Sequence, residues 1–251
     1  MQKSSILEYR LQPQQIARKR EAVRRAFIAA SKNITGGNIT RMADSDLKIL
    51  FELYDALFLE HFWQKNFKGS LTFSLSTRMS RSAGKVISPR NLADMRPGEE
   101  RFEMRISVDL FFHYNELNRA KVVNGITTED ALEAFQLVFE HELCHLLELH
   151  VYKQSSCRHS RFKTIAVNLF GHTESYHLLP TMREIAGEKF GLQVGDTVCF
   201  TWEGRVLEGE ISGITKRATV MVRDKKGEFR DPKGRRYTKW YVPLSRLHKK
   251  K

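Results

Sequence analysis

The sequence contains no long hydrophobic run. No stretch approaches the roughly 18–20 consecutive apolar residues that a membrane-spanning helix needs. Its first residues lack the apolar core and the small-residue cleavage site of a secretory signal. We therefore expect a protein that makes no membrane contact and is not secreted, located in the cytoplasm or associated with a nucleoid or nucleus.

Cysteine is scarce, and its three copies, Cys144, Cys157 and Cys199, are odd in number and far apart. They form no C-x-x-C pair, which excludes a zinc ribbon, and they offer no disulfide framework, so we expect free thiols in a reducing compartment. The 251-residue chain is long enough for one large or two smaller cores. Its 41% hydrophobic and 28% charged residues are typical of soluble globular proteins.

Acidic residues are outnumbered by basic ones, and the excess positive charge is unevenly distributed. The formal net charge is +13, of which residues 1–40 carry +6, residues 41–190 carry −1 and residues 191–251 carry +8. A nearly neutral body between two basic ends is typical of a protein held on a polyanion such as nucleic acid. The alternative is that the basic ends are solvated and only aid solubility.

The pattern predicts three regions, which are a basic N-terminal helical segment (1–42), an α+β body (43–190) and a basic all-β barrel (191–251). Helical periodicity predicts four helices. The first covers 13–31, and the second covers 44–63 with Asp44 or Ser45 as N-cap. The third begins at Thr127 or Thr128 and runs to about 152, and the fourth covers 159–170 and ends at Gly171. Alternating apolar residues predict a small sheet with strands at 71–77, 84–88 and 101–111.

The C-terminal region has no helical pattern. It contains five short segments of strand character, separated by turns at Gly195-Asp196, Glu203-Gly204, Lys226-Gly227 and Lys233-Gly234. Five short strands in so few residues leave no room for a second sheet. The region is therefore predicted to form a small closed barrel.

A His-Glu-x-x-His string, His141-Glu142-Leu143-Cys144-His145, lies in the helix that ends near 152. Residues four apart share a helix face, so His141 and His145 can bind one Zn²⁺ ion. Glu142 is turned by about 100° and can accept a proton from a zinc-bound water, which is the division of roles that metal-assisted hydrolysis requires. The alternative is a helix with two structural histidines. Cys144 is expected to pack in the core.

A zinc site of this kind needs a third protein ligand. His150 lies on a different face of the same helix and is too distant. The remaining candidates lie further along the chain and are His159, His172, Glu174 and His177.

Several segments resemble, in order, the SprT-like domain, the metallopeptidase fold of the Spartan DNA–protein-crosslink proteases. They are LYDALFLEHF (53–62), LTFSLSTRMSRSAGKV (71–86), FEMRISVDLF (102–111) and HELCH (141–145), within roughly 45–180. The resemblance implies a zincin-like zinc endopeptidase with His141 and His145 as ligands and Glu142 as general base.

The sequence departs from this family in two ways. The family's third histidine usually stands four residues before an aromatic residue, whereas His159 stands three before Phe162 and His172 stands four before Tyr176. The overall spacing favours His159 as the third ligand, and the local spacing keeps His172 as its alternative. The family's C-terminal zinc ribbon is absent, and the predicted barrel stands in its place.

Residues 195–222 resemble SH3-like barrels of the KOW and Tudor kind. Cations there can contact phosphates, and exposed aromatic side chains can stack on bases. The predicted nucleic-acid contacts are Lys216, Arg217, Arg223, Lys225, Lys226, Arg235, Arg236 and Lys239. Trp240, Tyr241 and Val242 are alternatively barrel core. Arg78, Arg81 and Lys85 could line a substrate or DNA channel, or be solvated.

The sequence therefore predicts a zinc-dependent endopeptidase that acts on DNA-associated or DNA-crosslinked proteins. Nucleic acid, with DNA as the expected form, would be bound by the basic N-terminal helix and the barrel. One alternative is a nucleic-acid-binding factor with a structural zinc site and no peptidase activity. The other is a general cytosolic metallopeptidase. Glu142 favours an enzyme because a structural zinc site has no use for it.

Overall fold

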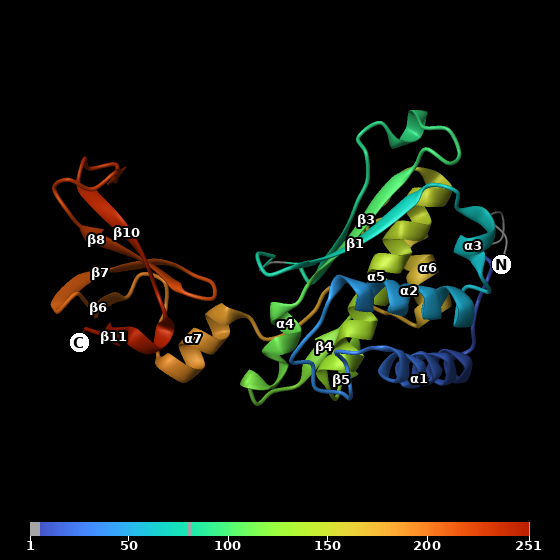
Figure 1. Ribbon diagram of the computed structural model, residues 1–251, viewed down its shortest axis with the longest axis horizontal. Coiled ribbons are helices and arrows are strands. Elements are labelled where there is room, and N and C mark those ends of the chain that lie inside the picture. Colours follow the sequence, from blue (N-terminus) through green and yellow to red (C-terminus); the bar gives the residue numbers. More distant parts are fainter. Residues whose placement is uncertain (1–5, 80–81, 251) are drawn as a thin grey trace. The chain divides into compact units, whose positions relative to one another are not determined.

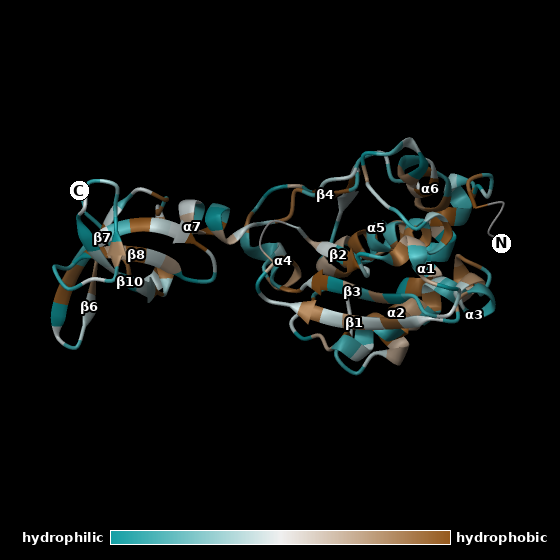
Figure 2. Ribbon diagram, turned by 90° about the horizontal axis from the view of Figure 1, so that it is seen from above, coloured by the Kyte–Doolittle hydropathy of each residue, from teal (hydrophilic) through white to brown (hydrophobic). Residues whose placement is uncertain are grey.

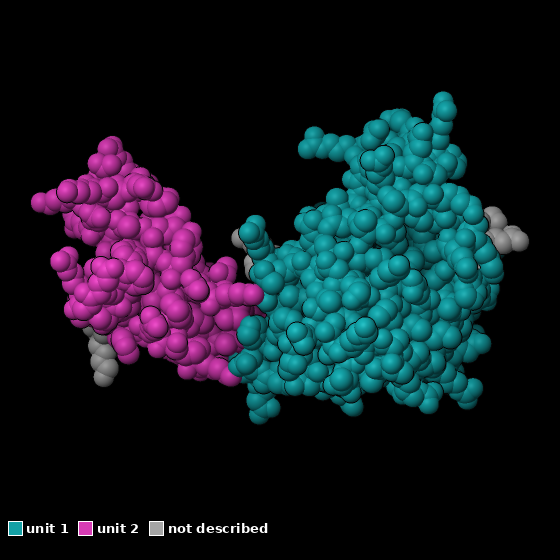
Figure 3. Space-filling model, in the orientation of Figure 1, with its two compact units in different colours: residues 1–179 teal, residues 180–251 magenta. Residues whose placement is uncertain are grey.

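The computed structural model of the chain describes residues 6–79 and 82–250, so Arg81 lies outside the described residues. The structure is mixed α+β, which confirms the predicted class, and it divides into two compact units, Met1–Leu179 and Pro180–Lys251 (Figures 1 and 3). Among the described residues, no helix has both the length and the apolar character that crossing a membrane requires.

Unit 1 contains a three-stranded sheet in the order β1-β3-β2. Its strands are β1 (Ser70–Ser76), β2 (Gly84–Ile87) and β3 (Arg101–Ser107). β3 pairs in parallel with β1 and antiparallel with β2. Met104 and Ile106 of β3 are buried, and the register places Val86 and Gly84 opposite them. Because side chains alternate between faces, Gly84 lies on the buried face of the sheet.

Helices cover this buried face (Figure 1). The helices of unit 1 are α1 (Pro13–Ala30), α2 (Asp44–Leu57), α3 (Phe62–Asn66), α4 (Asp109–Phe112), α5 (Ala131–Tyr152) and α6 (Ser160–Phe170). α5 packs against β2 and β3, α2 packs against β1, and α1 lies against both helices. Figure 2 shows brown and teal stretches in the helices of this unit, as expected for amphipathic elements. Short 3₁₀ turns occupy Leu92–Asp94 and Tyr114–Glu116.

A buried charge network joins α1, α2 and α5. Glu140 of α5 is fully buried and accepts two hydrogen bonds from Arg20, at 2.8 and 2.7 Å, and one from Tyr54, at 2.7 Å. Nε2 of His172 lies 2.8 Å from the same carboxylate. Burial alone would raise the pKa of Glu140, but the charge of Arg20 and the hydrogen bond to His172 lower it to about 2. The carboxylate is therefore charged and fully satisfied inside the core.

The start of α5 differs from the prediction. Thr127 and Thr128 do not cap the helix, because they belong to β5 (Ile126–Thr128), which pairs with β4 (Lys121–Val123). Both residues of the intervening turn, Asn124-Gly125, have positive φ, as a tight hairpin turn requires. The N-cap is Asp130, whose carboxylate accepts the backbone N–H of Glu133 at 2.9 Å.

Two further elements are shorter than predicted. The helix expected over 44–63 ends at Leu57 and resumes as α3, because Glu60 and His61 adopt left-handed backbone conformations. The strand expected over 101–111 ends at Ser107, after which Asp109–Phe112 form a single helical turn. The expected N-cap of α2 is also wrong. Ala43 occupies that position, and the carboxylate of Asp46 accepts its N–H at 2.7 Å.

Unit 2 is a six-stranded antiparallel sheet in the order β11-β6-β7-β8-β10-β9, preceded by one helix. Its elements are α7 (Met182–Phe190), β6 (Thr197–Trp202), β7 (Arg205–Ile214), β8 (Ala218–Arg223), β9 (Phe229–Arg230), β10 (Arg236–Val242), a 3₁₀ turn (Leu244–Arg246) and β11 (His248–Lys249). The sequence pattern missed α7. Ala186 of this helix is buried in the core of unit 2, so the division between units falls before α7 and not at residue 190.

We predict that breaking the Arg20–Glu140 pair destabilises unit 1 strongly. Arg20→Met should lower the free energy of unfolding by about 3–5 kcal/mol, because it leaves a buried carboxylate without its counter-charge. Denaturant unfolding followed by circular dichroism measures the change. Arg25→Met is the matched control on the same helix. Arg25 is 74% exposed and pairs with exposed Glu21, so its loss should cost no more than about 0.5 kcal/mol.

The contribution of Glu140 should also depend on pH. Its folded-state pKa lies below the usual 4.5, so the stability it contributes is complete above that value and is lost as pH falls toward about 2. The difference in stability between wild type and Glu140→Gln should therefore shrink over this window. A difference that stayed constant from pH 5 to pH 2 would contradict a charged Glu140.

Candidate metal centre

His141 and His145 lie one turn apart on α5, as their spacing predicts. Their ring centroids are 4.9 Å apart. Both rings pack against Phe162 of α6, at centroid distances of 4.9 and 4.4 Å. The ring of Phe162 therefore limits the rotation of both imidazoles and holds them as a pair.

The structure adds Cys157 to this pair. One ring nitrogen of His141, one of His145 and the Sγ of Cys157 all lie within 4.8 Å of one another, which makes them a possible metal-binding group. Cys157 is partly buried in the loop between α5 and α6. Within 6–79 and 82–250, no other set of three histidine, cysteine or acidic side chains converges in this way.

His159, the predicted third ligand, does not belong to this group. It is the N-cap residue of α6, and its side chain is exposed. Its backbone N–H donates to the carbonyl of Ser156 at 2.9 Å, which closes a tight turn around Cys157. The turn brings Cys157, and not His159, to the histidine pair. Sequence spacing alone could not show how this loop turns.

The other candidates are placed elsewhere as well. His172 is buried and held by Glu140 in the charge network described above. Glu174 is exposed, and His177 pairs with Val123 in an isolated β-bridge. Cys144 is fully buried in the core, as predicted. A thiol shortly after the helix that carries His141 and His145 was a signal available in the sequence, because zinc sites often combine cysteine with histidine.

The environment keeps both histidines neutral. Burial is the main cause that lowers the pKa of His141 to about 3, and the neighbouring His145, His172 and His177 act in the same direction. Burial also lowers the pKa of His145 to about 4, against a smaller opposing effect of Glu148. Neutral imidazoles have a lone pair to offer, so near neutral pH both side chains are ready to bind a metal without releasing a proton.

Glu142 is a buried carboxyl group with an unsatisfied oxygen. Its side chain is 3% exposed, and among the described residues its Oε2 has no hydrogen-bond partner. Burial raises its pKa to about 8. The backbone of β2 passes directly over it, since a Cβ placed on Gly84 would lie 2.7 Å from its Oε1. Gly84 is thus the residue type that lets the strand approach this carboxyl group.

The predicted nucleic-acid contacts lie on unit 2 and differ in their surroundings. Arg235 pairs with Asp231 at 2.6 Å, Arg236 donates to the carbonyl of Gly227 at 2.9 Å, and the ammonium of Lys239 lies 4.0 Å from the ring centroid of Phe229. Exposed residues among the predicted contacts include Lys216, Arg217, Arg223, Lys225 and Lys226. The unit therefore keeps a set of basic side chains on its surface.

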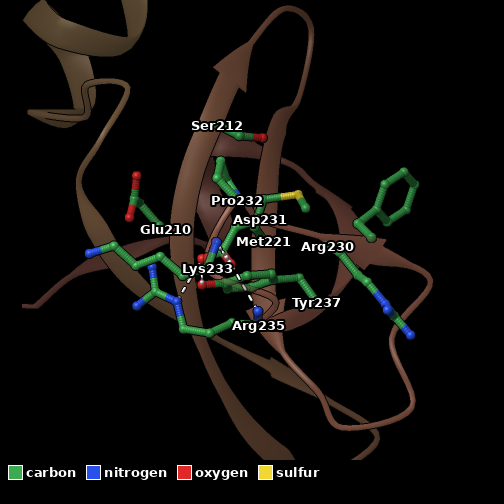
Figure 4. Close-up of a pocket in the computed structure, with 10 residues that line it drawn as sticks. Glu210, Ser212, Met221, Arg230, Asp231, Pro232, Lys233, Arg235 and Tyr237 are labelled. Atoms are coloured by element: carbon green, nitrogen blue, oxygen red, sulfur yellow. Dashed lines mark hydrogen bonds and ion pairs between the residues drawn. The ribbon is translucent and has the colours of Figure 1, made fainter.

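Aromatic side chains accompany these cations. A pocket of about 370 Å³ is lined by Arg230, Lys233, Arg235 and Tyr237, among others (Figure 4). Tyr241 is 63% exposed, whereas Trp240 packs against the core and Val242 is buried in it. Trp240 and Val242 therefore belong to the core of unit 2, and Tyr241 does not.

The basic N-terminal helix uses much of its charge internally. Arg20 is bound to Glu140, and Arg24 pairs with Asp130 at 2.6 Å. Lys19 donates to the carbonyl of Leu57. Arg18 and Arg25 are exposed. A nucleic-acid contact through α1 would therefore have fewer cations than the sequence suggested.

No protein-family model, no curated protein and no solved structure matches this chain.

We predict that Glu142→Gln stabilises the metal-free protein. The folded-state pKa of Glu142 is about 8, against the usual 4.5. As pH rises between these two values, the folded protein loses stability, because the carboxyl group ionises more readily in the unfolded chain. The amide of the variant cannot ionise. At pH 7 its free energy of unfolding should therefore be higher than that of wild type by about 1 kcal/mol or more, which raises Tm by roughly 2–4 °C. Thermal unfolding in the presence of a chelator measures this.

A glutamate on the same helix supplies the control. Glu148 is equally buried but is paired with Arg161 at 2.9 Å, so Glu148→Gln should destabilise the protein. The same direction of change in both variants would contradict the contrast between a paired and an unpaired carboxyl group.

Proposed function

We propose that the chain is a zinc-dependent peptidase whose metal is held by His141, His145 and Cys157. The observation that carries the proposal is the buried carboxyl group of Glu142, whose Oε2 has no hydrogen-bond partner among the described residues, next to His141 in a convergent group of three potential ligands. Two imidazoles and a thiolate suit Zn²⁺, and three protein ligands are the number that catalytic zinc sites use. A structural zinc site has four protein ligands and no need for an unpaired acid.

The residues divide the chemistry of amide hydrolysis. Zinc bound at this position would polarise the scissile carbonyl and lower the pKa of water. In its ionised form, Glu142 would accept a proton from the attacking water and pass it to the departing amine. The unsatisfied Oε2 of Glu142 is the atom that would contact this water.

The edge of the sheet offers a place for an extended substrate. β2 is the last strand of the β1-β3-β2 sheet, and no described strand pairs with its outer edge. An extended peptide can add to such an edge through backbone hydrogen bonds that are independent of its sequence. Gly84 brings this strand against Glu142, so a peptide on β2 would run past the catalytic carboxyl group. We infer a polypeptide substrate.

The substrates that we propose are proteins associated with or crosslinked to DNA. The exposed cations of unit 2 and the exposed Tyr241 provide phosphate contacts and a stacking surface of the kind that nucleic-acid-binding modules use. Binding to DNA would concentrate the enzyme near its substrates. The resemblance of 45–180 to the SprT-like domain and of 195–222 to SH3-like barrels supports the same proposal.

Proteolysis and metal content test the peptidase proposal. The assay is cleavage of a DNA-bound basic protein with and without DNA. Glu142→Gln should lower the rate by about 10²–10⁴-fold while zinc content stays near one per chain, because Glu142 moves protons and does not bind the metal. Equal cleavage by wild type and Glu142→Gln would sink the proposal. Wild-type zinc binding without any cleavage would favour a structural zinc site in a nucleic-acid-binding factor.

Metal analysis also decides the third ligand. Cys157→Ala should lose zinc, whereas Cys199→Ala, which removes a thiol from unit 2, and His159→Ala should keep it. If His159→Ala lost zinc and Cys157→Ala retained it, the third ligand would be the histidine that the sequence spacing favoured.

The nucleic-acid proposal predicts a salt-dependent loss of binding. Replacing Arg217, Arg223, Lys225 and Lys226 by alanine should weaken binding to DNA and reduce the slope of log affinity against log salt by about 0.9 for each lost phosphate contact on duplex DNA. Fluorescence anisotropy of a labelled oligonucleotide over a salt series measures both. The paired variant Arg18→Ala/Arg25→Ala tests α1 separately. An unchanged slope in the unit 2 variant would contradict its role.

A further inference from the structure

His145 makes a hydrogen bond that its partner in the pair lacks. Its Nδ1 lies 2.8 Å from the Oγ of Ser155, in the loop that also carries Cys157. The Nδ1 of His141 is buried and, among the described residues, has no hydrogen-bond partner. The two imidazoles are thus held differently, one by packing alone and one by packing and a specific polar contact.

Ser155 is itself committed to a buried carboxylate. Its hydroxyl donates to Oε2 of Glu148 at 2.6 Å. Glu148 is fully buried, accepts the backbone N–H of Ser156 on the same oxygen at 3.2 Å, and pairs with Arg161 through its other oxygen at 2.9 Å. Both oxygens of Glu148 thus accept hydrogen bonds, and the single hydroxyl proton of Ser155 points to Oε2.

This chain of contacts determines which nitrogen of His145 carries its proton. Because the proton of Ser155 is used on Glu148, its oxygen can only accept from the ring. The neutral imidazole must then carry its proton on Nδ1, which leaves the lone pair on Nε2. We propose that Ser155, oriented by Glu148, is a positioning residue that fixes His145 in the tautomer and rotamer that bind zinc through Nε2.

The proposal rests on the proposed zinc site and adds a cause for its affinity. In a neutral imidazole without such a partner, the two tautomers interconvert, so metal binding must first select the tautomer whose lone pair lies on Nε2. Hydrogen-bond acceptors behind metal-ligating histidines typically change metal affinity by about 10–100-fold. Since Ser155 and Cys157 share one loop, the same short segment orients one ligand and supplies another.

Zinc affinity in matched serine variants is the first test. Competition with a chromophoric chelator should show that Ser155→Ala binds Zn²⁺ about 10–100-fold more weakly than wild type, whereas Ser155→Thr, which keeps the hydroxyl, should restore most of the affinity. Ser156→Ala is the control for a lost hydroxyl in this loop, because that hydroxyl accepts the backbone N–H of Arg158 and the backbone N–H of Ser156 stays on Glu148. An affinity of Ser155→Ala equal to that of wild type would overturn the proposal.

The tautomer itself can be observed without any metal. Long-range ¹H–¹⁵N correlation spectra of the metal-free protein should show His145 protonated on Nδ1 in wild type and Ser155→Thr, and on Nε2 or in exchange in Ser155→Ala. A purely structural role of Ser155, such as tying the loop to α5, would lower Tm without changing this signature. The proposal would be overturned by an unchanged tautomer in Ser155→Ala. Failure of wild type to bind zinc would refute the metal site instead, and the spectra would still decide the tautomer.

Discussion

The rest of unit 1 depends on one constraint, which is that acidic side chains of α5 are buried in the core. α5 carries three carboxyl groups that solvent barely reaches, those of Glu140, Glu142 and Glu148. A carboxylate removed from water must be paired and hydrogen-bonded, or else hold its proton. The first of these groups is satisfied by Arg20 and Tyr54 and the third by Arg161 and Ser155, each at hydrogen-bond distance. The middle one, Glu142, is left with an unsatisfied oxygen, and this is the group beside the candidate metal ligands.

The compensating cations explain where the rest of the chain must pack. Arg20 reaches Glu140 only if α1 lies against α5, and Arg161 reaches Glu148 only if α6 returns along the same helix. The return of α6 in turn places Phe162 against both histidine rings and closes the loop that carries Cys157. The stability of the core and the geometry of the site are therefore coupled through the same salt bridges. This is why a basic amphipathic helix, which reads as a nucleic-acid-binding arm in the sequence, serves largely as an internal counter-charge.

Local patterns predicted what local physics determines. The amphipathic stripe of 13–31, the alternation at 71–77 and the i, i+4 spacing of His141 and His145 are visible in the sequence because periodicity follows from backbone geometry. The capping box that opens α7, Thr181 with Glu184, is also a signal of this local kind. What the sequence could not supply are contacts between residues far apart in the chain. The choice of Asp130 over Thr128 as N-cap depends on a hairpin, and the pairing of Arg20 with Glu140 spans most of unit 1.

The candidate third ligand shows the same limit at shorter range. His159 and Cys157 are separated by a single residue, and both types of side chain bind zinc, so spacing cannot decide between them. The decision is made by the turn that His159 closes with Ser156, and by the extended backbone of His159 as the residue before a helix, which leaves its side chain exposed. A thiolate in this position carries a negative charge that a third imidazole would not. It would offset part of the charge of a divalent ion. The metal would then be held more tightly and would polarise the substrate carbonyl less. An enzyme built this way would rely more on Glu142, in its ionised form, to carry the proton transfers of amide hydrolysis.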